Sequence, residues 1–184
     1  MSACHPDTVH PSTKLNPHPE KRYELTLKID DAPGPFDSVG GVLLYEVVNE
    51  SCVPATGGPM NPLRLMPQAN PKITFDKVSD GVYRTTVYGD YFQDEDYFGL
   101  GICHWSLTGA VARLKIKKNT MAPYLSSEQL LSEQPALYYF TKDSYLSNDD
   151  IEVSFGGEPL RFNYPTNMQD KLFLITITTK EVIP

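Results

Sequence analysis

Hydrophobic and polar residues alternate strictly over residues 23–29, where every second side chain is apolar. Because successive side chains of a strand point to opposite faces, this stretch predicts a half-buried β-strand. Residues 41–48 are almost continuously apolar, which predicts a second strand that is covered on both sides. Residues 53–71, by contrast, are rich in Pro and Gly and predict a long loop.

The longest strand signal covers residues 101–118, and its phase changes part-way. Cys103, Trp105 and Leu107 share one parity, whereas residues 112, 114 and 116 share the other. A phase change around Gly109 predicts a β-bulge, in which one extra residue interrupts the alternation. Two strands joined by a turn at Thr108-Gly109 are the alternative.

The remaining pattern consists of short elements separated by turn signals. Residues 72–75 and 82–88 predict a hairpin around the Ser79-Asp80-Gly81 turn, and further strands are expected at 136–141, 151–155 and 171–180. Residues 126–131 predict one short helix, with Ser126 as N-cap and Gln129 completing a capping box. Together these elements predict a mostly β fold, an antiparallel β-sandwich of immunoglobulin-like or transthyretin-like architecture.

Length and charge limit the domain organisation and the partners. The chain has 184 residues, which suits a single sandwich domain over residues 22–184 behind a tail. Residues 1–21 are rich in Pro and polar residues, which predicts a disordered tether. The net charge of −7 disfavours nucleic acid and adsorption to anionic lipid.

The first four residues, Met1-Ser2-Ala3-Cys4, resemble the end of a lipoprotein signal peptide. We therefore expect a lipid on Cys4 and a periplasm-facing protein, anchored to the outer membrane through this lipid alone. The other two cysteines, Cys52 and Cys103, then form an even pair, as expected of a disulfide in an oxidising compartment. Such a bridge would close a loop of about 50 residues and stabilise the fold by about 4 kcal/mol. Two buried free thiols are the alternative.

A search for catalytic motifs finds no Gly-x-Ser-x-Gly elbow and no Gly-rich phosphate loop. His104 is the only histidine beyond residue 21, and a lone strand histidine is more often structural. We therefore expect no enzyme, no cofactor and no resident metal. Asn49-Glu50-Ser51 matches a glycosylation sequon, which is a frequent chance match.

Residues 88–98 interleave aromatic and acidic side chains, a combination that suits a protein-binding loop. The residues expected to contact a partner are Tyr88, Asp90, Tyr91, Phe92, Asp94, Glu95, Asp96 and Tyr97. A Ca²⁺ site is one alternative, although the carboxylate spacing departs from that of an EF-hand. A solvated hairpin tip with its aromatic side chains packed inward is another.

One stretch carries a family resemblance. Tyr97-Phe-Gly-Leu-Gly-Ile-Cys-His-Trp105, followed by Ala110-Val-Ala-Arg-Leu-Lys-Ile116, resembles small proteobacterial envelope lipoproteins. Lipoproteins of this kind often resemble immunity proteins against antibacterial lipase effectors of type VI secretion. The resemblance implies a protein that binds a toxin, a lipase or another hydrolase, and occludes its active site. An envelope module that binds a small ligand, a sugar or Ca²⁺ is the alternative.

Overall fold

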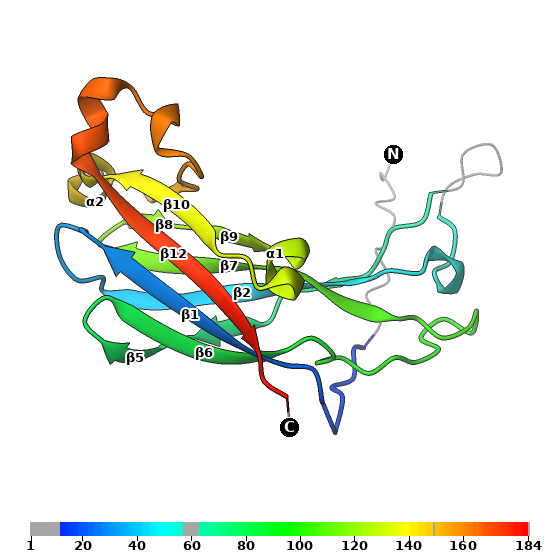
Figure 1. The fold of residues 1–184 in the computed structure, drawn as a ribbon. Helices are drawn as coiled ribbons and strands as arrows, with labels where there is room; N and C mark the ends of the chain where they lie inside the picture. The colour runs from blue at the N-terminus through cyan, green and yellow to red at the C-terminus, as the bar shows by residue number, and fades with distance from the viewer. Residues whose placement is uncertain (1–11, 57–62, 149, 184) are drawn as a thin grey trace, which may run out of the picture.

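The computed structural model describes residues 12–56, 63–148 and 150–183, which form a β-sandwich of two sheets (Figure 1). The first sheet has the strand order β10 (Ala136–Thr141), β12 (Leu172–Glu181), β1 (Arg22–Asp30), β6 (Val82–Tyr88), β5 (Asp76–Ser79). The second has the order β11 (Val153–Phe155), β8 (Asn119–Met121), β7 (Trp105–Ile116), β2 (Ser38–Val47), β3 (Gln68–Ala69). Two strands lie off this path, β4 (Lys72–Thr74) beside β2 and β9 (Tyr124–Ser126) beside β7. The predicted β-sandwich is thus confirmed, although β11 and β8 pair in parallel.

The core forms where the inner faces of the two sheets meet. Every second residue of β1 points inward, so Leu25 and Leu27 are almost completely buried. On the adjacent β12, Ile175 and Ile177 are buried in the same way. Each such side chain contributes about 1.5–3 kcal/mol when it leaves water, so the alternation that predicts the strands also supplies the core.

Strand β2 departs from its prediction because only one of its faces is buried. Leu43, Tyr45 and Val47 point inward, whereas Leu44 and Glu46 on the outer face are partly exposed. The expectation of cover on both sides was therefore wrong. Val42 and Leu44 on the outer face are apolar, but the fold does not enclose them.

The predicted β-bulge is confirmed, and β7 is one strand. Leu44 of β2 pairs with Gly109 and the next residue, Tyr45, pairs with Leu107, so Thr108 is the extra residue. A Cβ atom on Gly109 would lie 2.8 Å from the Tyr124 ring and 2.9 Å from the Leu125 carbonyl oxygen. Glycine is needed there because the paired strand β9 and the Tyr124 ring leave no space for a Cβ atom.

The predicted hairpin of residues 72–75 and 82–88 was wrong in its pairing. Strand β4 pairs with β2 in the second sheet, and β6 pairs instead with β5 in the first. Phe75 is the single residue between β4 and β5, and the chain passes there from the second sheet to the first. Its side chain is buried in the core. The Ser79-Asp80-Gly81 turn therefore joins β5 to β6.

Helices are short and lie at the ends of strands. Helix α1 (Ser127–Ser132) begins with the predicted capping box between Ser126 and Gln129. The prediction of a single helix missed α2 (Lys142–Leu146), where the Thr141 hydroxyl accepts the Ser144 N–H. It also missed the 3₁₀ helices η1 (Glu50–Cys52), η2 (Arg161–Asn163) and η3 (Thr166–Lys171).

The described part of the predicted tether, residues 12–21, lies against the domain. The Asn16 N–H donates to the Tyr91 carbonyl at 2.8 Å, and the Gln93 N–H donates to the Lys14 carbonyl at 2.9 Å. This part of the segment is therefore docked rather than extended away from the fold. Cys4 lies outside the described residues, and within those described no helix is long and apolar enough to span a membrane.

Candidate protein-binding site at the disulfide end

Two loops meet at one end of the sandwich, to the right in Figure 1. One follows β2 and includes η1, and the other leads from β6 to β7. We call this region, residues 48–56, 63–67 and 89–104, the disulfide end. Cys52 and Cys103 join the two loops in the predicted disulfide, with a Cα–Cα distance of 5.3 Å, and both residues are buried.

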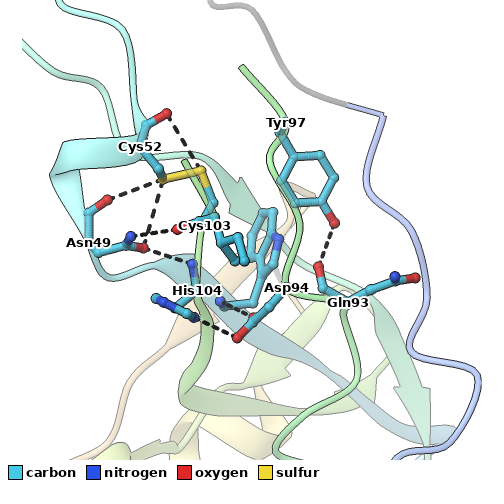
Figure 2. A network of polar contacts seen from close by, with 9 residues as sticks. Asn49, Cys52, Gln93, Asp94, Tyr97, Cys103 and His104 are labelled. Carbon is cyan, nitrogen blue, oxygen red and sulfur yellow. Dashed lines mark hydrogen bonds and ion pairs between the residues drawn. A yellow bond between two sulfur atoms is a disulfide. The ribbon is translucent and has the colours of Figure 1, made fainter. Parts of the chain in front are cut away.

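Asn49 continues the pairing of β2 and β7 beyond their last strand residues. Its Oδ1 accepts the backbone N–H of His104 at 2.7 Å, and its Nδ2 donates to the Ile102 carbonyl at 2.8 Å (Figure 2). The Val48 N–H also donates to the His104 carbonyl, at 2.9 Å. The Asn49 amide, which also belongs to the chance sequon match, therefore braces the two loops against each other.

Asp94 holds the start of β7 from the opposite side. Its Oδ1 accepts the Trp105 N–H at 2.9 Å, and its Oδ2 lies 2.7 Å from Nδ1 of His104 (Figure 2). Both side chains are about half exposed, so this side-chain contact contributes only about 0–1 kcal/mol. The backbone hydrogen bond is the more important contact, because it gives the N–H of the first residue of β7 an acceptor.

A carboxylate that orients an imidazole forms two-thirds of a catalytic triad. The third member would be a nucleophile bonded to Nε2 of His104. Within the described residues no hydroxyl or thiol makes that bond, and the neighbouring Cys103 is held in the disulfide. The cluster thus offers a carboxylate and an imidazole that bind and orient each other. The expectation of a non-enzyme stays a prediction.

The aromatic residues of the predicted binding loop mostly face inward. Phe92 is buried and packs edge-on against Tyr45, with ring centroids 5.0 Å apart, and against Trp105 at 5.1 Å. Tyr91 packs against the same Tyr45 ring, whose hydroxyl donates to the Tyr88 carbonyl. This burial raises the pKa of the Tyr45 phenol above its ordinary value, and nearby Tyr91 and Asp90 add to the effect.

The acidic residues of that loop bind the protein's own chain. Asp90 accepts the N–H groups of Glu20 and Lys21 at 2.9 and 3.0 Å. Glu95 pairs with Lys14 at 2.6 Å.

At the last turn of the loop, Asp96 and Tyr97 also bond to the protein's own backbone. Asp96 accepts the Leu100 N–H at 3.0 Å, and the Tyr97 hydroxyl donates to the Gln93 carbonyl at 2.6 Å. The structure therefore gives the predicted residues a supporting role, and their contact with a partner stays a prediction.

Sequence reasoning missed a second feature of this end, its exposed apolar side chains. They are Val48 at 59% exposure, Leu63 at 54%, Leu65 at 41%, Leu100 at 51% and Ile102 at 54%. Val48 lies beside His104 across the strand pair, and Ile102 follows the same alternation. The sequence feature that could have indicated them is the presence of apolar residues within loops. A search for strand periodicity does not detect such residues.

The chain matches no protein-family model, no curated protein and no solved structure. The resemblance to immunity lipoproteins therefore stays an expectation. Among the described residues, no group of three His, Cys, Asp or Glu side chains gathers as a metal site requires.

Proposed function

We propose that this protein neutralises a secreted antibacterial toxin, a lipase or another hydrolase, by covering the entrance to its active site with the disulfide end. The observation that carries the proposal is the set of exposed apolar side chains on loops that are fixed in place. Large apolar side chains that gather at one place on a surface are typical of protein interfaces.

Rigidity is the second support. The disulfide, Asn49 and Asp94 hold both loops before any partner arrives. A preformed surface loses little conformational entropy on binding, so more of the energy from apolar burial goes into affinity. Covering an active-site entrance requires such a surface and requires no catalytic group of its own.

Charge and compartment are consistent with this proposal. Glu50, Asp94 and Asp96 are exposed on the same two loops as the apolar side chains, and such carboxylates steer a basic partner toward the surface. The Cys52–Cys103 disulfide supports an oxidising compartment such as the periplasm. Because these two residues pair with each other, Cys4 remains available for the lipid that we propose as its anchor.

The test compares the full chain with V48D/I102D and with the control I151D/F162D, whose wild-type side chains are 70% and 73% exposed. Secreted proteins of the source bacterium are passed over each immobilised protein. Any retained hydrolase is then purified and its activity measured with increasing amounts of each protein. We expect wild type and control to inhibit it, and V48D/I102D to inhibit roughly 100-fold more weakly. Equal inhibition by all three, or retention of no hydrolase, would overturn the proposal.

A further inference from the structure

The outer face of the second sheet carries a row of polar side chains that the proposed function does not use. Lys115 of β7 pairs with Thr120 of β8, and Thr120 pairs with Ser154 of β11. All three lie on the outer face, because their sequence neighbours Leu114 and Met121 are buried in the core. Neighbouring strands lie about 4.8 Å apart, so an ammonium group and two hydroxyls stand side by side.

Arg113 lies on the same face, two residues before Lys115. The residue opposite it on β2 is Gly40, and Ala122 follows Met121 on the other side. These small neighbours leave a hollow of about 440 Å³ that Arg113, Lys115, Thr120 and Ser154 line together. The guanidinium therefore has room above the sheet.

The four side chains have no partner within the part of the chain that the structure describes. Other cations do: Lys14, Lys28, Lys77 and Arg84 each pair with a carboxylate. Arg113 and Lys115 form no such pair, and the side chains of Thr120 and Ser154 form no hydrogen bond there. The exposed Glu152 also lines the hollow without pairing with either cation, so the local charge is positive in a chain of net charge −7.

We propose that this hollow binds the phosphate group of a phosphate ester. A guanidinium donates to two phosphate oxygens at once, an ammonium donates to a third, and the two hydroxyls supply further donors. A carboxylate has only two oxygens and would leave the hydroxyls unused. The negative charge of the whole chain does not prevent binding, because exposed charges more than about 8 Å away are largely screened at physiological salt.

The phosphate comes either from a soluble ester or from an anionic phospholipid headgroup, and the first experiment uses a soluble ester. Glycerol phosphate is titrated into the full chain while backbone amide NMR shifts are followed, with sodium chloride at equal ionic strength as reference. We expect saturable shifts at Lys115, Thr120 and Ser154 with the ester only. R113S/K115S should bind at least about tenfold more weakly, since it loses both charge-assisted contacts.

The control R84S/K180S removes the same charge from β6 and β12 of the first sheet. It should bind glycerol phosphate like wild type. Melting temperatures check the fold of each variant, and K115S alone repeats the test should the double variant unfold. Shifts that do not saturate, or an equal loss in R84S/K180S, would overturn the proposal for the soluble ester.

Vesicles test the second source. The full chain is sedimented with phosphatidylcholine vesicles that contain or lack phosphatidylglycerol. Sedimentation that needs both phosphatidylglycerol and Arg113/Lys115 assigns the headgroup as ligand, and shifts with glycerol phosphate alone assign a soluble ester. Absence of both overturns the site. The disulfide-end proposal is unaffected by that result, because the hollow and the disulfide end share no residue.

Discussion

Single side chains at the disulfide end complete hydrogen bonds that the strands leave open. Asn49 bonds to the backbone of His104, 55 residues away, and Asp94 bonds to Trp105 across a loop. Neither contact follows a strand or helix period, so the pattern of the sequence could not show it. Asn49 and Asp94 instead matched a sequon and a binding loop, which are local patterns.

Removal of the Asp94 carboxylate tests its role as a backbone acceptor. We expect Asp94→Ala to lower the free energy of unfolding by about 1–2 kcal/mol, because the Trp105 N–H loses its partner. Asp94→Asn keeps one acceptor oxygen and should lose less than half as much. Urea denaturation measures both variants. Equal losses would show that the charge, and not the acceptor, matters.

Buried phenols predict how stability depends on alkaline pH. Burial raises the pKa of Tyr45, so the folded protein keeps this proton to a higher pH than the unfolded chain does. Above a pH of about 10 the unfolded chain binds fewer protons than the folded protein does. The free energy of unfolding should therefore fall as the pH rises.

Tyr45→Phe removes the titrating group and should flatten this fall, although it also loses the hydrogen bond to the Tyr88 carbonyl. The measurement is urea denaturation at pH values on both sides of about 10, in a Cys4→Ser background that prevents thiol exchange. An unchanged pH dependence in Tyr45→Phe would contradict this assignment.

At the scale of elements, the sequence predicted the long strands and two of the short ones, β4 and β11, but missed β3, β5, β8 and β9. Strands β1, β6, β7, β10 and β12 were recognised because each presents several alternating residues to the core. Strand β8 has three residues, too few to show a period, and all four residues of β5 are exposed. The change of sheet at Phe75 depends on the pairing partners of β4 and β5, which are β2 and β6. Such pairing is decided by tertiary structure and not by the local sequence.

The bulge in β7 makes a sharp prediction about glycine. Gly109→Val should destabilise the fold by about 1–3 kcal/mol, because the new side chain would meet the Tyr124 ring and the Leu125 carbonyl. Gly156→Val is the matched control, since a Cβ atom there meets nothing within 4 Å. Thermal unfolding compares the two. A similar loss in both would mean that a general cost of replacing glycine by valine, and not the close approach of β9, decides.

For the whole molecule, the disulfide supplies a covalent link between two loops that lie far apart in the sequence. It joins residues 51 apart in sequence and fixes both loops of the proposed binding surface. The number of cysteines was enough to predict this pair. The net charge of −7, by contrast, gave no indication of the basic hollow on the second sheet. Composition averages over all faces, and only the strand register places Arg113 and Lys115 beside two hydroxyls.

Removal of the disulfide should weaken the fold and the surface together. The chain-entropy estimate for a loop of this size predicts that Cys52→Ser/Cys103→Ser lowers the free energy of unfolding by about 4 kcal/mol. Urea denaturation of wild type with and without reductant, beside the double variant, measures the loss. Reductant should leave the double variant unchanged. A loss below about 1 kcal/mol would mean that the other contacts already hold the two loops.

The central claim is that the disulfide end covers a protein partner, and amide hydrogen exchange on the full chain with and without its captured hydrolase tests it most directly. We expect added protection in residues 48–52, 63–67 and 98–104, with β5 and α2 at the far end unchanged. Protection confined to the outer face of either sheet, or no change at the disulfide end, would contradict it.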